Sequence, residues 1–219
     1  MGSPFTVRKA IADTGLQLYK RGMLAGTDGN LSVRLDDDRI MITPTGASKG
    51  RLRPDDMVIV DVNGKHLQGQ NKASSESAMH LFVYRSRSEV KACVHTHAPY
   101  ATAFAVAGVS PGEDVLPEVI VSVGNIPLTD YAQPGTEEVW KSIAPHIETC
   151  NAFLLRNHGL LTIGRSLEEA FNRHEVVEHY TRILFLARQL GNVEAIPSED
   201  FVRLEAMRKK LDEAWNKKS

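Results

Sequence analysis

The stretch Val90-Lys91-Ala92-Cys93-Val94-His95-Thr96-His97 carries the strongest structural signal in this chain. Its run of apolar and β-branched residues predicts a buried strand. Alternate side chains of a strand share a face, so His95 and His97 should point the same way. Zinc binds neutral imidazole nitrogens and takes three or four protein ligands. The end of this strand is therefore a candidate metal site.

Two further motifs outside this strand offer the ligands that such a site still needs. Asn157-His158-Gly159 forms a tight turn between two apolar runs, and Ser74-Ser75-Glu76 precedes an apolar helix pattern. Three imidazoles with one carboxylate are a suitable zinc set, although another divalent metal could occupy it. The five other histidines are interpreted as structural or surface residues: His66, His80, His146, His174 and His179.

The rest of the chain alternates helix and strand patterns. Helices are predicted at residues 5–24, 74–87, 100–106, 136–147, 166–190 and 197–216. Strands are predicted at residues 31–35, 39–43, 57–62, 65–67, 115–123, 152–155 and 160–163, with a short extended piece at 125–128. Asn63-Gly64 is a strong hairpin turn, and Ser166 with Glu169 forms a capping-box pattern. We expect one α/β domain over residues 1–219 with a largely antiparallel, hairpin-built sheet and a C-terminal helix at about 197–216.

Composition narrows the class of protein. The chain has 219 residues, 42% of them apolar, and a formal charge of −1. This balance argues against nucleic acid or an anionic membrane as a partner. No apolar stretch is long enough for a transmembrane helix, and no signal peptide is expected. The chain has only two cysteines, Cys93 and Cys150, so we expect no disulfide framework. We expect a cytoplasmic location.

Three segments have the composition of anion-binding loops. Gly29-Asn30 and Thr45-Gly46 combine free backbone N–H groups with a polar side chain, and Ser74-Ser75 lies where a helix dipole favours an anion. Each pattern alone is also typical of an ordinary turn or cap. The nearest cationic candidate is Lys49, whose simplest interpretation is a solvated loop lysine.

Taken together and in order, these motifs resemble the class II aldolase/adducin family and, within it, the L-fuculose-1-phosphate aldolase group. The resemblance extends from about Val7 to Gly191. It is carried by the following motifs: Gly29-Asn30-Leu31-Ser32, Thr43-Pro44-Thr45-Gly46, Ser74-Ser75-Glu76, His95-Thr96-His97 and Asn157-His158-Gly159.

The resemblance implies a fold, a metal and an assembly. The fold would be a three-layer α/β/α arrangement around a central, mainly antiparallel sheet. One zinc ion per subunit would be held by His95, His97 and His158, with Glu76 as both a ligand and the catalytic acid/base. The substrate phosphate would be held by the following residues: Gly29, Asn30, Thr45, Gly46, Ser74 and Ser75. A C4 homotetramer with interfacial active sites would be expected.

The chain departs from that group at one catalytic position. The fuculose-phosphate aldolases place a tyrosine from the adjacent subunit in the stretch corresponding to residues 115–120, and this chain has none there. Glu118 lies near that position, and Tyr131 matches a different tyrosine of the family. Either could serve as a proton donor, although Tyr131 could equally be an ordinary packing aromatic.

The predicted reaction is the reversible cleavage of a ketose 1-phosphate to dihydroxyacetone phosphate and an aldehyde through a zinc-stabilised enediolate. The same site could instead serve epimerisation of a pentulose phosphate, dehydration of methylthioribulose 1-phosphate or decarboxylation of a sugar-acid phosphate. A third possibility is a non-enzymatic, adducin-like module. The intact set of His95, His97, His158 and Glu76 argues against it.

Overall fold

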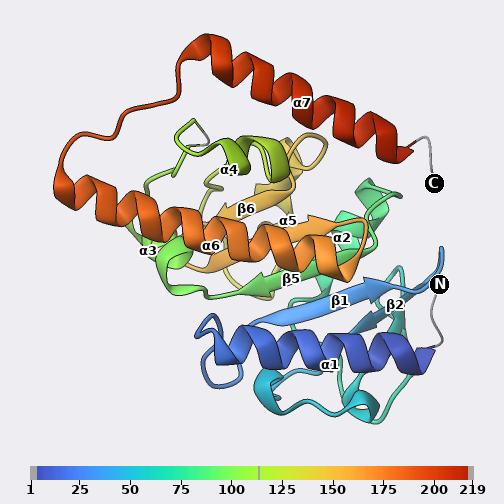
Figure 1. Cartoon of the computed structure of the whole chain (residues 1–219). Helices are drawn as coiled ribbons and strands as arrows, with labels where there is room; N and C mark the ends of the chain where they lie inside the picture. The colour runs from blue at the N-terminus through green and yellow to red at the C-terminus, as the bar shows by residue number, and fades with distance from the viewer. Residues whose placement is uncertain (1–3, 113, 217–219) are drawn as a thin grey trace.

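A seven-stranded antiparallel sheet forms the centre of the molecule in the computed structural model, which describes residues 4–112 and 114–216 (Figure 1). The strand order is β4-β3-β2-β1-β5-β7-β6, and every neighbouring pair runs antiparallel. The strands are β1 (Asn30–Arg34), β2 (Arg39–Ile42), β3 (Val58–Asp61), β4 (His66–Gln68), β5 (Ala92–Thr96), β6 (Ala152–Leu155) and β7 (Gly159–Gly164). The strand β5, whose sequence leads into His97, lies inside the sheet between β1 and β7.

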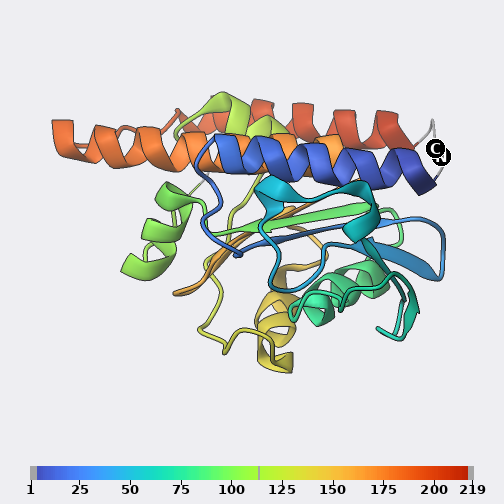
Figure 2. The same ribbon diagram turned by 90° about the horizontal axis from the view of Figure 1, so that it is seen from below.

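Helices cover both faces of the sheet, which confirms the three-layer expectation (Figure 2). One face carries α1 (Pro4–Lys20), α3 (Pro99–Ala107), α4 (Pro117–Ser122) and α6 (Leu167–Leu190). The other carries α2 (Ser77–Ser86) and α5 (Glu137–Ile143). The remaining elements are α7 (Ser198–Asn216) and three short 3-10 helices, η1 (Lys49–Arg51), η2 (Pro54–Asp56) and η3 (Ala144–His146).

The two apolar layers of the core follow from strand alternation. On β5, Ala92 and Val94 join the layer under α1 and α6, whereas Cys93 joins the layer under α2 and α5. Side chains of a strand alternate between faces. His95 therefore follows Cys93 onto the α2 side, and Thr96 faces α6, where its hydroxyl lies 2.7 Å from Nε2 of His174.

The strand predicted over residues 115–123 is wrong, because this segment contains the helix α4. Pro117 occupies the first helical turn, where its missing N–H costs nothing and its fixed φ suits a helix. The Leu116 carbonyl accepts from the amides of Val119 and Ile120. The β-branched residues that suggested a strand are instead buried against the core along one side of a short helix, so tertiary packing overrides local propensity.

Three helix ends also differ from the prediction. The first helix ends at Lys20 rather than near residue 24, and Gly22 follows with a left-handed φ of 73°. The helix after the serine pair begins at Ser77, and the Ser74 hydroxyl accepts from the Glu76 amide instead of capping the helix. The Thr136 hydroxyl donates to the Gln133 carbonyl rather than capping α5.

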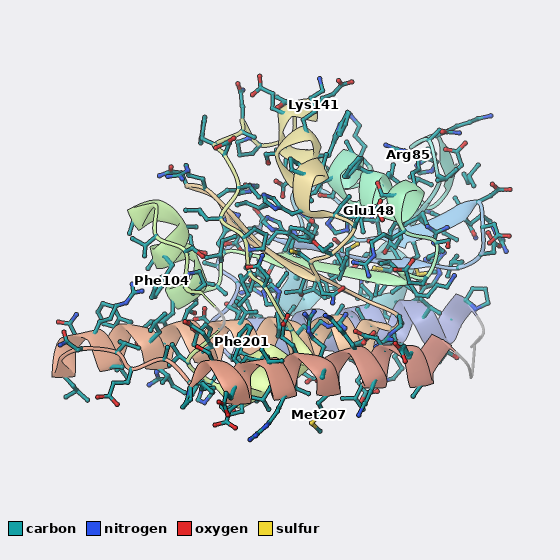
Figure 3. The ribbon with its side chains drawn as sticks, turned by 90° about the horizontal axis from the view of Figure 1, so that it is seen from above. Arg85, Phe104, Lys141, Glu148, Phe201 and Met207 are labelled. Carbon is teal, nitrogen blue, oxygen red and sulfur yellow. The ribbon has the colours of Figure 1, made fainter. Side chains whose placement is uncertain are left out.

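The C-terminal helix is confirmed, and so is the Ser166 half of the predicted capping box, whereas the Glu169 carboxylate accepts from the Arg165 amide and not from that of Ser166. The Ser166 hydroxyl accepts from the Glu169 amide at the start of α6. The helix α7 packs against α4, and Phe201 faces inward while Met207, 52% exposed, points away (Figure 3). None of the helices in the described part of the chain has an apolar stretch able to cross a bilayer.

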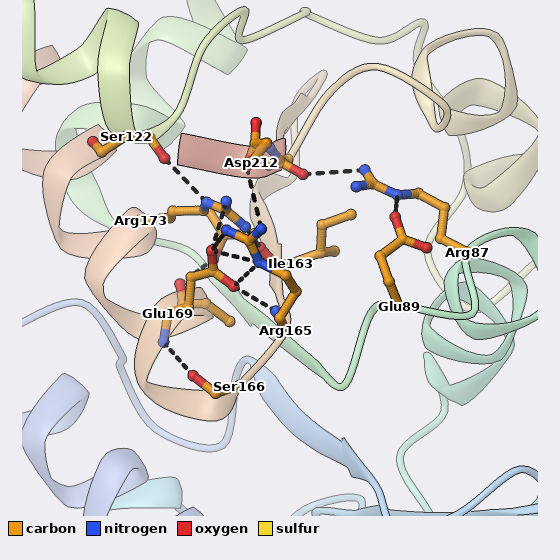
Figure 4. A network of polar contacts seen from close by, with 12 residues as sticks. Arg87, Glu89, Ser122, Ile163, Arg165, Ser166, Glu169, Arg173 and Asp212 are labelled. Atoms are coloured by element: carbon orange, nitrogen blue, oxygen red, sulfur yellow. Dashed lines mark hydrogen bonds and ion pairs between the residues drawn. The ribbon is translucent and has the colours of Figure 1, made fainter. Parts of the chain in front are cut away.

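A network of ion pairs closes one end of the β5–β7 pair, just beyond Gly164 (Figure 4). Arg165 and Arg173 both bind the carboxylate of Glu169, at 2.6 and 2.9 Å. Arg173 also donates to the carbonyls of Ser122 and Ile163. Arg165 reaches α7 through a 3.3 Å contact with Asp212. The network therefore joins α4, β7, α6 and α7 at this end of the sheet.

Candidate metal centre

Three histidine side chains converge at the opposite end of the β5–β7 pair. His95 is the fourth residue of β5, His97 follows the strand directly, and His158 precedes β7. Their candidate ligand nitrogens all lie within 4.8 Å of one another. The ring centroids of His95 and His97 are 5.4 Å apart, as strand alternation predicts, and His158 stands 4.7 and 5.1 Å from them.

The turn that carries His158 is shaped to approach β5 closely. Asn157 has a left-handed φ of 54°, and Gly159 begins β7. A Cβ atom at position 159 would lie 2.5 Å from the Thr96 carbonyl oxygen and 2.9 Å from Cδ2 of His97. Glycine is therefore required here for the imidazoles to pack together.

Neighbouring oxygen atoms indicate which nitrogen of His95 and His97 is free to bind a metal. Nδ1 of His95 donates to the Leu160 carbonyl at 3.0 Å, and Nδ1 of His97 lies 3.3 Å from Oδ2 of Asp28. The Nε2 atoms of both rings are buried and have no hydrogen-bond partner among the described residues. Buried polar atoms are normally paired. This arrangement, with Nδ1 held by an oxygen and Nε2 presented, is the one that metal-binding histidines use.

Glu76 completes the group from the beginning of α2. Its Oε1 lies 3.0 Å from Nε2 of His158, and its Oε2 lies 3.4 Å from Nε2 of His95. Oε2 also accepts a 2.7 Å hydrogen bond from Nδ2 of Asn30. Burial raises the pKa of this carboxyl, but the electrostatic attraction of the neighbouring His95 and His158 rings outweighs it and holds the pKa far below its usual range. Glu76 is therefore a carboxylate at neutral pH.

The protonation of His97 also suits a metal ligand. Burial and the repulsion of His95 and His158 lower the pKa of His97 to about 4, while Asp28 and Glu76 act in the opposite direction. The ring is therefore neutral at pH 7, and a neutral imidazole is the form that coordinates a metal. Together, three imidazoles, one carboxylate and two unpartnered Nε2 atoms fit a divalent metal ion.

The three predicted anion-binding segments lie beside this group. Asn30 pairs with His95 across the β1–β5 ladder, and a Cβ at Gly29 would lie 2.7 Å from the His95 carbonyl oxygen. The segments that carry Thr45 and Ser74 run next to each other. The Ser74 amide donates to the Thr43 carbonyl, and the Thr45 amide donates to the Lys72 carbonyl. The structure thus brings segments from three parts of the chain to one place.

The individual anion-binding residues differ in exposure. Gly29, Asn30 and Ser74 are buried, whereas Thr45, Gly46 and Ser75 are exposed. The exposed positions are the ones that a ligand can reach from solvent. The Ser74 hydroxyl is already used within its own turn by the Glu76 amide, at 3.3 Å.

The two candidate proton donors lie outside the histidine group. Tyr131 is 62% exposed, and Glu118 is exposed in the first turn of α4. The segment after Tyr131 reaches the site's edge, because a Cβ at Gly135 would lie 3.7 Å from the Ser75 carbonyl oxygen. A catalytic role for either residue stays a prediction.

Two residues at this site were missed or misjudged at the level of sequence. Asp28, which contacts His97, also accepts a 2.8 Å hydrogen bond from the Ala25 amide. Its place in a glycine-rich turn directly before Gly29 was the available signal. The interpretation of Lys49 as a solvated loop lysine is wrong, because this side chain is buried in the structure.

The histidines outside the group divide as expected into structural and surface residues. His174 is fully buried between the hydroxyls of Thr96 and Thr162, and His80 is fully buried against the Ser32 hydroxyl. Burial lowers the pKa of each to about 3, so both rings are neutral. His66 and His179 are exposed, and His146 is partly buried.

Comparison with known proteins identifies the family. The model of the Class II Aldolase and Adducin N-terminal domain matches residues 9–185. A 3-oxo-tetronate 4-phosphate decarboxylase from Haemophilus influenzae is 35% identical over 182 residues, 81% of this chain and 86% of that protein. An L-fuculose phosphate aldolase from Methanococcus maripaludis is 36% identical over 173 residues, 79% of this chain and 93% of that protein.

Solved structures agree with these relatives. An L-fuculose 1-phosphate aldolase superposes with a TM-score of 0.86 at 32% identity, covering 97% of this chain and 98% of that one. The chain therefore belongs to the class II aldolase and adducin family, and it is an enzyme of the class II aldolase superfamily. Both the resemblance and the fold expected from the motifs are confirmed.

Proposed function

We propose that this chain is a zinc-dependent aldolase that reversibly cleaves a ketose 1-phosphate into dihydroxyacetone phosphate and an aldehyde. The observation that carries the proposal is the pair of buried, unpartnered Nε2 atoms of His95 and His97 next to His158 and Glu76. When bound there, a divalent metal supplies a positive charge that stabilises negative charge developing on the substrate's oxygens.

Glu76 is the proposed acid/base. The hydrogen bond from Asn30 fixes one of its oxygens, and the other lies beside His158, so the carboxylate has a defined orientation. In cleavage, the protonated form would deliver a proton to the carbon released from the broken bond. In condensation, the carboxylate would remove that proton. Its low pKa in the structure reflects the imidazoles around it, and loss of those contacts would make Glu76 a stronger base.

The three anion-binding segments are the proposed phosphate site. Gly29-Asn30, Thr45-Gly46 and Ser74-Ser75 lie beside the histidine group and offer amides and hydroxyls. Anchoring the phosphate would hold the reacting carbon at a fixed distance from Glu76, which lowers the entropic cost of the reaction. The family's activity on sugar phosphates supports this assignment.

Decarboxylation of a sugar-acid phosphate is the second candidate reaction. It is favoured by the decarboxylases among the relatives, at 34 to 35% identity. Both reactions break a carbon–carbon bond next to a carbonyl group and leave negative charge on the same substrate atoms, so one site can serve either. Tyr131 is the proposed proton donor to the aldehyde oxygen in condensation, and in cleavage its deprotonated form would take the hydroxyl proton as the aldehyde leaves. Decarboxylation would not require this transfer, because the carboxylate that leaves as carbon dioxide carries no such proton.

Metal analysis together with product analysis tests the proposal. We expect about one zinc ion per chain and release of dihydroxyacetone phosphate from a ketose 1-phosphate, identified by mass spectrometry. Release of carbon dioxide from a 3-oxo acid phosphate would favour the second candidate, and loss of water or a change of configuration only would favour a dehydratase or epimerase. A protein with neither metal nor turnover would be a non-catalytic, adducin-like module.

The substitution Glu76→Gln tests the acid/base assignment. It keeps the size and the hydrogen bond to Asn30 but removes the titrating group, so turnover should fall about 10²–10⁴-fold while most zinc is retained. Glu137→Gln, at an exposed position of α5, is the matched control. Near-normal turnover in the Glu76 variant would remove this residue from the mechanism.

We further propose a homotetramer with active sites at subunit boundaries, in line with the exposed position of Tyr131 away from the histidine group of its own chain. Light scattering of the purified protein measures the assembly. A monomer with full activity would exclude a contribution from a neighbouring chain.

A further inference from the structure

Lys49 places a buried ammonium group between two of the anion-binding segments. The residue is only 3% exposed. Its Nζ donates to the Thr27 carbonyl at 2.6 Å and to the Ala47 carbonyl at 2.9 Å. Thr27 lies two residues before Gly29, and Ala47 directly follows Gly46. One side chain therefore ties together two loops that are distant in sequence.

Each loop is anchored on its other side, so the tie sets their separation. The 3-10 helix η1 that begins with Lys49 packs against α1. The Thr45 amide donates to the Lys72 carbonyl, which fixes the preceding segment to the chain leading into α2. In the other loop, Asp28 accepts from the Ala25 amide and contacts His97. The ammonium of Lys49 thus joins a loop held by α1 and by the segment before α2 to a loop that contacts His97.

The charges around Lys49 give the ammonium a second effect. Burial lowers its pKa, and the carboxylates of Asp28 and Glu76 raise it. These two carboxylates would repel a phosphate dianion that enters the site. A positive charge close to both offsets that repulsion, and a buried charge is little screened by solvent.

We infer that Lys49 is a positioning residue for the substrate phosphate: it holds the loops of Gly29-Asn30 and Thr45-Gly46 at the spacing that a phosphate bridges, and it offsets the charge of Asp28 and Glu76. The inference rests on the proposed phosphate site. Lys49 acts through the loops, since its own side chain is nearly inaccessible and its ammonium donates to the carbonyls of Thr27 and Ala47.

Calorimetric titration of the zinc-loaded protein with inorganic phosphate tests the inference without any turnover. Lys49→Met removes the ammonium but keeps the buried stem, and we expect phosphate to bind about ten-fold or more weakly. Lys72→Met, at an exposed lysine next to the same loop, should bind phosphate as the wild type does. Zinc stoichiometry should be the same in all three proteins.

Kinetics separate positioning from a purely structural role. With a turned-over sugar phosphate, Lys49→Met should raise KM about ten-fold and leave kcat within about three-fold, because the group is lost from binding and not from the chemical step. Lys49→Gln keeps an N–H donor without the charge and should recover part of the affinity. A purely structural role would lower the melting temperature without raising KM selectively over kcat.

The outcomes are distinguishable from failure of the proposed function. Unchanged phosphate affinity in Lys49→Met overturns the inference, and so does a wild-type protein that binds no phosphate. A wild-type protein that binds phosphate but cleaves no ketose 1-phosphate overturns the reaction alone. If neither variant folds, hydrogen exchange of the wild-type protein with and without phosphate tests the inference. Phosphate should protect residues 27–30 and 45–48 together, and protection of neither loop overturns the inference.

Discussion

The two ends of the β5–β7 pair are built from similar polar groups and differ in how those groups are satisfied. At the end beyond Ala92 and Gly164, Arg165 and Arg173 are both paired with Glu169 (Figure 4). At the end beyond Thr96 and Leu160, the Nε2 atoms of His95 and His97 are buried without a hydrogen-bond partner among the described residues.

This difference distinguishes a cluster whose polar groups are satisfied within the protein from one that is suited to binding an ion. A partly buried charge network with its partners in place stabilises the packing of helices on a sheet end. Unpartnered buried nitrogens cost free energy in the isolated protein, and their retention is explained when a bound ion satisfies them. Substitutions at the two ends should therefore change different measured quantities.

The largest effect is expected for His97→Gln. Loss of a residue that only orients a metal ligand lowers metal affinity roughly 10–100-fold, and loss of one imidazole ligand should lower zinc affinity by more than this. Turnover should fall about 10³-fold. Zinc content and turnover measure this. The metal-free variant should unfold within about 1 kcal/mol of the metal-free wild type, since the side chain is 35% exposed. A variant with normal zinc content would remove His97 from the ligand set.

Glu169→Gln should have the reverse pattern. Removal of the carboxylate leaves Arg165 and Arg173 facing each other without their shared partner, and the free energy of unfolding should fall by about 2–3 kcal/mol. Zinc content and the turnover of the folded protein should stay unchanged. Urea unfolding at pH 7 measures the loss, and a loss of zinc with intact stability would contradict the division between the two ends.

The pH dependence of this loss has a defined sign. Burial opposes ionisation of Glu169, but hydrogen bonds from Arg165 and the charge of Arg173 outweigh it and lower the pKa from its ordinary value of 4.5. The stabilisation is thus complete above pH 4.5 and is lost as the pH falls through the folded-state pKa, because the unfolded chain takes up the proton first. The difference between wild type and Glu169→Gln should narrow below pH 4.5. A difference that widens there would contradict the assignment.

Asp28→Asn should have a smaller effect at the metal end. The carboxylate lies against Nδ1 of His97 and would orient the ring without touching the metal. Loss of such a partner lowers metal affinity about 10–100-fold, which competition with a zinc chelator measures. Asp13→Asn, at an exposed position of α1, is the control. Unchanged zinc affinity would show that the contact with Asp28 does not position His97.

The smallest effect is expected for Glu89→Gln at the ion-paired end. Glu89 binds Nε of Arg87 at 2.7 Å but its side chain is 46% exposed. Solvent screening limits such a pair to about 0.5 kcal/mol of unfolding free energy, and the difference should disappear in 1 M salt. A loss comparable to that of Glu169→Gln would mean that exposure does not govern the strength of pairs in this network.

Most strands and helices could be predicted from the sequence because their signals are local. The alternation of Cys93, His95 and His97, the Asn63-Gly64 turn and the Ser166 cap each depend on neighbouring residues. The structure of residues 115–123 could not be predicted in this way, because Val119, Ile120 and Val121 favour a strand by propensity. Whether they lie in a strand or on a buried side of a short helix depends on the core around them.

The candidate site divides in the same way. The sequence by itself identified the candidate ligands and the family: the spacing in His95-Thr96-His97 set two imidazoles on one face, and the order of the motifs matched the family. Only the tertiary structure decided that Asp28 contacts His97 and that Lys49 is buried between two loops. These contacts join segments that lie far apart along the chain. They depend on the pairing of β1 with β5 and on the packing of α1 against both β1 and η1, which no local pattern of residues encodes.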